Sequence, residues 1–293
     1  MYREEPCKTA LNPVKGMGFR WSLNPYMGCV HRCTFCYVRA FERRADRPSD
    51  ERYGRSIRVK TNVVEVLRAE VSRPGWQREN VAIGAATDPY QPAEGTYRLT
   101  RGCLETLSRA RNPFNIITRG PMIIRDIDVL RDASARARVS VSISIPTLDP
   151  EVWRTTEPGT APPRQRLRAV RELSEAGIDV SVGIAPVIPG LSDGVGSLTQ
   201  VMLAARQAGA SGAWCNVLHL RPGTREHFLE YLEHDWPSLL PRYARMYRNA
   251  YLSRKQEDEI RALVREIDAR VGVGENRGDR IEPPQPAEQL ALL

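Results

Sequence analysis

The chain has 293 residues, of which 41% are hydrophobic and 27% charged, a composition that excludes a disordered chain and is sufficient for a sizeable core. Its net charge of +8 is compatible with a polyanionic partner such as nucleic acid, and equally with a solvated basic surface, because the basic residues form no single block. No apolar run is long enough to cross a bilayer and the N-terminal segment has no apolar signal region, so we expect a cytoplasmic protein with no membrane partner.

Short apolar runs alternate with amphipathic segments along most of the chain. Strands are predicted at residues 19–26, 81–87, 114–118, 139–145, 178–188 and 212–220. Helices are predicted between them at residues 96–111, 123–136, 161–177 and 195–209. This alternation is typical of βαβ units and a parallel sheet, and about six such units predict an α/β fold, a partial (β/α)6 barrel with its site at the C-terminal ends of the strands.

The segments outside this alternation define the remaining parts of the chain. Residues 1–18 are expected to form an irregular N-terminal arm before the barrel, which we assign to residues 19–223. Residues 224–272 contain only helical patterns and are expected to close or cover one end of the sheet. Residues 273–293 have the composition of a flexible tail.

The strongest chemical signal is a cysteine triplet. Cys29, Cys33 and Cys36 stand at Cys-x-x-x-Cys-x-x-Cys spacing, and in a reducing compartment such cysteines are metal ligands or free thiols. Three thiolates on one loop can hold three irons of a cubane cluster and leave the fourth iron open to a small molecule. A zinc site is the alternative; it would need a fourth ligand, which His31 or His219 could supply.

The triplet, with Phe35 before its last cysteine, resembles the signature of the radical S-adenosylmethionine (SAM) superfamily, and the resemblance covers roughly residues 19–220. It implies a partial (β/α)6 barrel, a [4Fe–4S] cluster on Cys29, Cys33 and Cys36, and SAM bound at the open iron. It also implies that an electron from a reductant such as flavodoxin or ferredoxin cleaves SAM to a 5′-deoxyadenosyl radical, which takes a hydrogen atom from the substrate.

Under the same resemblance, further residues are expected to bind the cofactors. They are Phe35, Thr87, Asp88, Arg119, Ser144 and Pro189. Thr87 and Asp88 would meet the SAM amino group, and Arg119 would pair with its carboxylate. Ser142 and Ser144 give their strand one polar face, and the loop 185–193 would cradle the adenine. The alternatives are a Pro-rich turn at Asp88, a solvent-facing charge at Arg119 and backbone hydrogen bonding at the serines.

The motifs CTFCYVR, TDPYQPAE, TRG and IRDIDVL resemble the spore-photoproduct-lyase-like branch of the superfamily, also described as DNA repair photolyases. In the lyase a cysteine precedes the Thr-Ser-Asp stretch and two tyrosines flank the last cluster cysteine. Here Ala85 and Ala86 precede Thr87, and the flanking residues are Phe35 and Tyr37. We expect Tyr37 to be catalytic.

Two cysteines outside the triplet lie in predicted elements of the barrel. Cys103 falls in a predicted helix and Cys215 in the last predicted strand, near the strand's C-terminal end. That position makes Cys215 a candidate radical-relay thiol. A buried, inert cysteine is the alternative for both.

The leading hypothesis is therefore a radical SAM enzyme, lyase-like, acting on a nucleic acid lesion or base. A duplex substrate would have to flip its base into the barrel. A second hypothesis is a radical SAM enzyme acting on a protein side chain or a small metabolite. A third is a non-catalytic iron–sulfur or zinc protein that binds nucleic acid.

Overall fold

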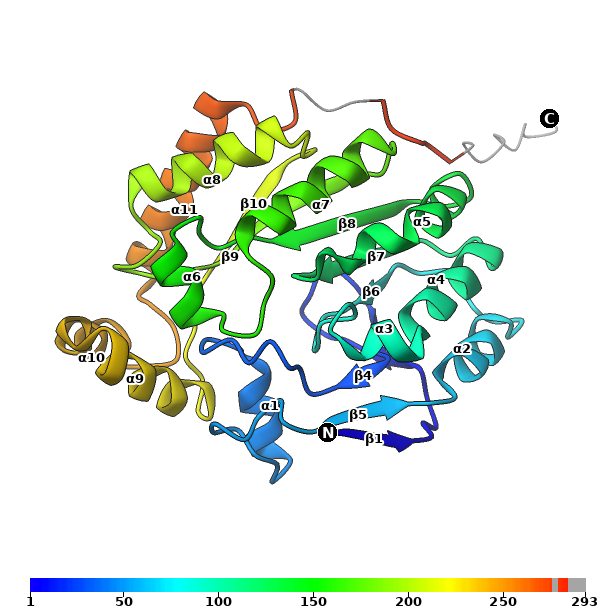
Figure 1. The fold of residues 1–293 in the computed structure, drawn as a ribbon, viewed down its shortest axis with the longest axis horizontal. Coiled ribbons are helices and arrows are strands. Elements are labelled where there is room, and N and C mark those ends of the chain that lie inside the picture. The colour runs from blue at the N-terminus through cyan, green and yellow to red at the C-terminus, as the bar shows by residue number, and fades with distance from the viewer. Residues whose placement is uncertain (276–278, 284–293) are drawn as a thin grey trace, which may run out of the picture.

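A seven-stranded sheet forms the centre of the molecule in the computed structural model, which describes residues 1–275 and 279–283 (Figure 1). In spatial order its strands are β2 (Leu11–Pro13), β3 (Trp21–Leu23), β6 (Val81–Ile83), β7 (Phe114–Thr118), β8 (Val139–Ser144), β9 (Val180–Val187) and β10 (Ala213–Val217). From β3 to β10 the strands run parallel, and β2 is antiparallel at one edge. The expected α/β fold, with the strand order of a partial (β/α)6 barrel, is confirmed.

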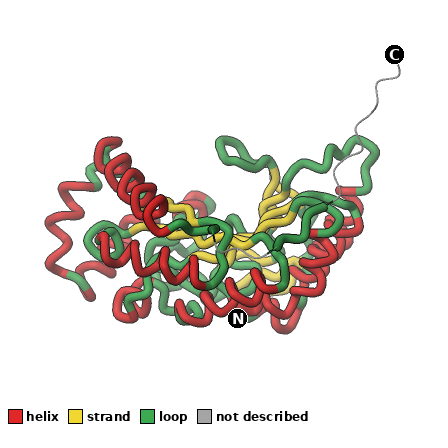
Figure 2. Tube along the Cα trace, turned by 90° about the horizontal axis from the view of Figure 1, so that it is seen from above, coloured by secondary structure: helices red, strands yellow, loops and turns green. Residues whose placement is uncertain are grey.

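The two faces of this sheet differ because side chains alternate along each strand. In β8, Val139, Val141 and Ile143 are buried on one face, whereas Ser140 and Ser142 are half-buried on the other. The apolar face packs against helices α2 (Val63–Val71), α4 (Leu99–Arg109), α5 (Ile127–Ser134), α7 (Pro163–Glu175), α8 (Val195–Gln207) and α11 (Arg254–Val271). We call the opposite, polar face the inner face. Figure 2 shows most helices along one side of the curved sheet, with loops rising on the other.

The N-terminal segment is not irregular, so the expected arm over residues 1–18 is wrong. Besides β2 it contains β1 (Tyr2–Glu5), which pairs with β5 (Ile57–Lys60) in a three-stranded sheet completed by β4 (Tyr26–Met27). The sequence YREE has no apolar alternation, because β1 is an exposed edge strand and the small core beneath comes from Ile57, Val59 and Tyr26. The polar pattern therefore concealed the strand.

Several short elements lie at the ends of the strands. They are α1 (Val38–Arg44), α3 (Ala93–Tyr97), η1 (Pro121–Asp126) and α6 (Pro150–Thr156). The helix predicted over 123–136 is thus divided into the 3-10 turn η1 and α5. Asp149 begins α6 by accepting hydrogen bonds from the backbone N–H groups of Glu151 and Val152.

The C-terminal segment is helical, as predicted, but its helices pack in two different places. Helices α9 (Thr224–Asp235) and α10 (Leu240–Met246), joined by η2 (Pro237–Leu239), form a core in which Phe228, Tyr243 and Tyr247 pack with Cys33 and Phe35. Helix α11 returns to the outer layer beside α8 and β10. Most of the predicted tail lies outside the described residues. No described helix is long and apolar enough to cross a membrane.

Candidate active site

The cysteine loop, residues 28–37, connects β4 to α1 and carries the triplet. Cys29 and Cys33 are buried, Cys36 is half-buried, and none of the three is in a disulfide. Tight turns hold the loop, since the N–H of Arg32 donates to the carbonyl of Cys29 and the N–H of Cys36 donates to that of Cys33. The Cys36 sulfur lies 3.6 Å from the Tyr53 hydroxyl.

Two glycines let distant parts of the chain approach this loop closely. A Cβ on Gly54 would lie 2.2 Å from the Cys29 carbonyl oxygen, and its φ of +79° is one that side chains rarely adopt. A Cβ on Gly159 would lie 2.3 Å from the Val30 carbonyl oxygen. The N–H of Thr34 also donates to Thr156, at 2.9 Å. The shape of the loop is therefore set by the segment before β5 and by the end of α6 with the residues that follow it.

The donor set of this loop fits an iron–sulfur cubane. Burial raises the pKa of the Cys33 thiol, and the Arg119 guanidinium opposes that rise. A bound metal removes such a proton outright. Within the described chain, no three His, Cys, Asp or Glu side chains meet as the ligands of a single ion. Cysteine thiolates are the ligands that hold iron–sulfur clusters, and this loop carries three of them.

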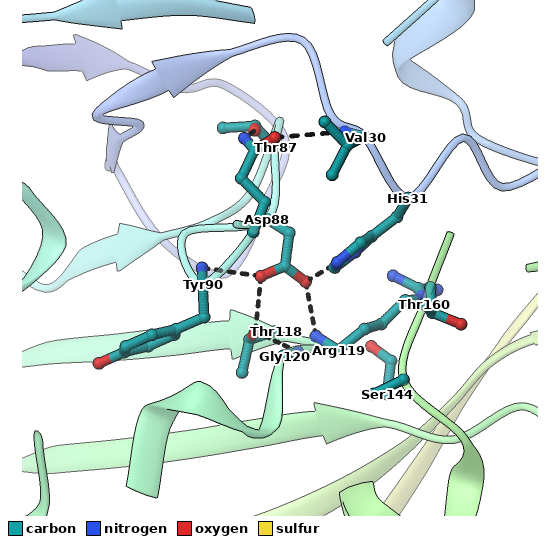
Figure 3. Close-up of polar contacts among 12 residues, drawn as sticks. Val30, His31, Thr87, Asp88, Tyr90, Thr118, Arg119, Gly120, Ser144 and Thr160 are labelled. Atoms are coloured by element: carbon teal, nitrogen blue, oxygen red, sulfur yellow. Dashed lines mark hydrogen bonds and ion pairs between the residues drawn. The ribbon is translucent and has the colours of Figure 1, made fainter. Parts of the chain in front are cut away.

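Asp88, in the loop that follows β6, is the centre of a buried network (Figure 3). Its carboxylate accepts hydrogen bonds from the Thr118 hydroxyl (2.7 Å) and the N–H groups of Arg119 (2.7 Å) and Tyr90 (2.9 Å). Nδ1 of His31, in the cysteine loop, lies 3.3 Å from the same carboxylate. Burial alone would raise the pKa of Asp88, but His31 and the hydrogen bonds lower it to about 2.

These contacts occupy the Asp88 carboxylate with groups of the protein itself. The carboxylate joins β6, β7 and the cysteine loop, and four neighbours already surround its two oxygens. Burial alone would lower the pKa of His31, but negative charge at Cys29 and Asp88 raises it to about 10, so the two side chains form an ion pair. The geometry makes Asp88 a positioning residue for the loop; its expected contact with the SAM amino group stays a prediction.

Thr87 and Gln91 fasten the same loop from the other side. The Thr87 hydroxyl donates to the Gly28 carbonyl at 2.8 Å. The Gln91 amide donates to Gly28 and to the Thr87 hydroxyl, and its oxygen accepts from the N–H of Val30 at 3.2 Å. The segment TDPYQ thus binds the loop backbone at several points. The role of Gln91 was missed, although the motif that contains it was noted.

Arg119, at the end of β7, belongs to a shared ion pair. Its Nε donates to Glu157 at 2.7 Å and its Nη2 to the Ala185 carbonyl at 2.8 Å. Glu157 is fully buried and also pairs with the fully buried Arg166 at 3.1 Å. Two guanidinium groups therefore share one carboxylate, which leaves positive charge beside Cys33. The Arg119 side chain is 20% exposed, so part of it remains open to an anionic ligand.

The remaining predicted cofactor residues lie around Arg119 or on the adjacent loop. The Phe35 ring lies under the Arg119 guanidinium, 5.6 Å from ring centroid to Cζ. Ser144, on β8, lies beside Arg119 (Figure 3), and its carbonyl accepts from Arg166 at 2.9 Å. Pro189 is bound to the helical extension, because its carbonyl accepts a hydrogen bond from the Tyr243 hydroxyl at 2.8 Å. The binding of SAM by these residues stays a prediction.

Tyr37 closes the cysteine loop against the second predicted strand. Its hydroxyl donates to the Ala85 carbonyl, and burial raises the pKa of Tyr37 to about 12. Its ring lies 6.0 Å from the His219 ring, which stacks on Tyr251 at 5.5 Å. Tyr37 is thus brought to the site.

Cys215 is not brought to the site. Its neighbours on β10, Trp214 and Asn216, are exposed on the inner face, so Cys215 points to the outer layer. There it packs against the main core, and Arg261 and Arg265 of α11 affect the pKa of its thiol, which burial raises. The structure contradicts a radical-relay role for Cys215, because the strand register places it on the wrong face of the sheet. Cys103 is fully buried in α4.

The geometry agrees with a comparison against known families. A sequence model of the Radical SAM superfamily matches residues 23–195, which is more than half of the chain and includes the cysteine loop and strands β6 to β9. This chain belongs to the radical SAM superfamily. It is therefore an enzyme whose cofactors are a [4Fe–4S] cluster and SAM. The hypothesis of a non-catalytic protein is not supported.

The relatives include proteins from bacteria and a phage. An uncharacterized protein of Mycobacterium tuberculosis is 37% identical over 296 residues, covering 100% of this chain and 86% of the relative. A radical SAM Nalpha-GlyT isomerase of Pseudomonas phage M6 is 28% identical over 171 residues, covering 57% of this chain and 33% of that protein. A solved structure of spore photoproduct lyase shares the fold, with a TM-score of 0.70 and 14% identity, covering 93% of this chain and 80% of that chain.

Proposed function

We propose that this radical SAM enzyme acts on a base of a nucleic acid, and that Cys29, Cys33 and Cys36 hold its cluster. The cluster, when bound, supplies the electron that splits SAM, and the carbon radical so formed takes a hydrogen atom from the substrate. The residues of the chain form the site in which SAM is split and the substrate loses its hydrogen atom.

Each part of the site has a task in this proposal. Asp88, Thr87 and Gln91 hold the cysteine loop against the ends of β6 and β7. Arg119 offers its exposed part to the carboxylate of SAM, while Glu157 fixes the direction of the guanidinium. Tyr37 shields the loop beside its last cysteine.

The observation that carries the choice of substrate is the chemistry of the inner face. It presents hydroxyl and amide side chains, from Asn115, Ser140, Ser142, Ser181 and Asn216. Three of these also bond within the protein, since Asn115 accepts from Asn80, Ser142 accepts from Trp214 and Ser181 donates to Val141. Such groups pair with the donor and acceptor edges of a base. The net charge of +8 adds attraction for a polyanion. The spore photoproduct lyase that shares the fold is itself complexed with a dinucleoside spore photoproduct.

Formation of 5′-deoxyadenosine tests the proposal. The protein is purified without oxygen, reconstituted with iron and sulfide, reduced with dithionite and given SAM, with and without a single-stranded oligodeoxynucleotide. We expect 5′-deoxyadenosine to form faster with the oligonucleotide, and Cys33→Ala to abolish it. Cys103→Ala, a buried cysteine in α4, is the matched control and should keep both the iron and the product.

The salt dependence of oligonucleotide binding completes the test. Contacts with phosphates release counterions, so affinity should fall steeply as salt rises. If 5′-deoxyadenosine forms at the same rate with and without the oligonucleotide, and no salt-sensitive binding is found, a nucleic acid substrate is ruled out. A protein side chain or a small metabolite then becomes the leading substrate class.

A further inference from the structure

Trp214 occupies an unusual place for a large apolar side chain. It lies on β10, the edge strand of the parallel sheet, and 39% of the residue is exposed. It points to the inner face, on the opposite side from Cys215. It is therefore an exposed aromatic ring on the same face as the polar side chains that line the proposed substrate space.

The indole lies across the sheet and not away from it. A Cβ on Gly183 of β9 would lie 2.7 Å from Cζ2 and 2.9 Å from Cε2 of Trp214, so the ring covers this glycine. The ring nitrogen then donates a hydrogen bond of 2.7 Å to the Ser142 hydroxyl on β8. Because β10, β9 and β8 are neighbours in the sheet, the side chain begins on β10, crosses β9 and ends at β8. One side of the ring is covered by the glycine, and the exposed fraction leaves area for a second flat ring.

The strand register connects this ring with the site. Trp214 pairs with Gly183, and Gly183 pairs with Ser144. On the next strand the last pair is Thr118 with Ile143, which puts Arg119 in line with Ser144. Arg119, Ser144, Gly183 and Trp214 thus form one row across the inner face. Neighbouring strands are about 4.8 Å apart, so the row extends about 14 Å from Arg119 to Trp214.

We propose that the Trp214 indole is a stacking platform for a planar ring of the substrate, a nucleobase, with Gly183 and Ser142 fixing its orientation. This inference rests on the proposed function. Aromatic side chains stack on bases because every base has a π-face, and a ring that is already immobilised loses little entropy on binding. A glycine on β9 is required, since any side chain there would displace the indole.

An oligonucleotide-binding assay tests the platform. A short, fluorescein-labelled, single-stranded oligodeoxynucleotide of mixed sequence is added to the reconstituted protein with SAM and without reductant, and binding is measured by fluorescence anisotropy. We expect Trp214→Ala to weaken binding by about 5- to 150-fold, the range found for base–aromatic stacking. Gly183→Ala should also weaken binding, although the indole is retained. Trp214→Phe should keep most of the affinity. Leu203→Ala, an exposed apolar residue on the outer helix α8, is the control and should change nothing.

Binding of radiolabelled SAM to the same variants, with iron content as the check on folding, separates the outcomes. Unchanged SAM affinity in Trp214→Ala, with weaker oligonucleotide binding, supports the platform. If SAM binding weakens equally, the stacked ring is the adenine of SAM and the inference is overturned. If Trp214→Ala binds the oligonucleotide as tightly as the wild-type protein, the stacking platform is overturned and the proposed function is unaffected. If the wild-type protein binds no oligonucleotide, the proposed function fails and the nucleobase assignment fails with it.

Discussion

Replacing Glu157 with glutamine should destabilise the protein more than any exposed charge change. The substitution keeps the shape of the side chain but removes the one carboxylate shared by Arg119 and Arg166. Arg166 is fully buried, so its charge would lose its counter-ion in a place that water does not reach. Removing one partner of a buried pair costs about 3–5 kcal/mol.

The lower end of that range applies here. Arg166 keeps hydrogen bonds to the carbonyls of Ala161 and Ser144 and to the Thr160 hydroxyl, and Arg119 keeps its bond to Ala185. We therefore expect a loss of about 3 kcal/mol. For a chain of this size each kcal/mol lowers Tm by about 2–4 °C, so Tm should fall by about 6–12 °C.

Urea unfolding and thermal unfolding of the reconstituted protein, followed by circular dichroism, measure this loss. The matched control is Glu172→Gln, which breaks the exposed pair with Arg168 on α7 and should cost at most about 1 kcal/mol. If Glu157→Gln is no more destabilising than Glu172→Gln, the shared ion pair is not an energetic centre of the site. The direction of Arg119 would then need another explanation.

Three further predictions concern the cysteine loop and the strands beside it. The pKa of Asp88 is about 2 in the folded protein and has its usual value of 3.8 when unfolded, so Asp88 adds stability above pH 4 that is lost as the pH falls toward 2. About 1 kcal/mol of it should be lost between pH 6 and pH 3, and urea titrations of Asp88→Asn should lack this part of the pH dependence; equal slopes would contradict it. Gly54→Ala should sharply lower iron content after reconstitution, because its Cβ would strike the Cys29 carbonyl, whereas Gly75→Ala, which has open space, should not; equal iron in both would refute the close approach. Cys215→Ala should keep normal 5′-deoxyadenosine formation, and a loss of product without loss of iron would restore the relay hypothesis.

The sequence predicted those features that depend on residues close together in the chain. The cysteine triplet is local, so its spacing and the family resemblance that it carries predicted the cluster loop, and short β-branched runs such as FNIIT predicted the parallel strands. Thr87 and Asp88 were expected to meet the SAM amino group, and that role stays a prediction. Their actual partners, Gly28 and His31, could not be derived, because those contacts require the fold.

The role of Glu157 could not be predicted from the sequence, because it depends on contacts between distant elements. Glu157 follows a short helix that the sequence analysis did not anticipate, and it becomes important only when Arg119 and Arg166 converge on it from different elements. The direction of Cys215, in contrast, was available from the sequence. In the strand AWCNV it alternates with Trp214 and the polar Asn216, so a polar inner face at Asn216 places Cys215 on the outer face.

The way the cysteine loop is held has a consequence for the order of events during synthesis. Thr34 donates to Thr156, which lies 122 residues later, and the Thr224 hydroxyl donates to Cys36, which lies 188 residues earlier. A ribosome that has just released the cysteines has therefore not yet made the residues that support them. The loop reaches its final shape only after most of the chain has been translated, so we expect iron and sulfide to be delivered to the completed protein and not to the nascent chain.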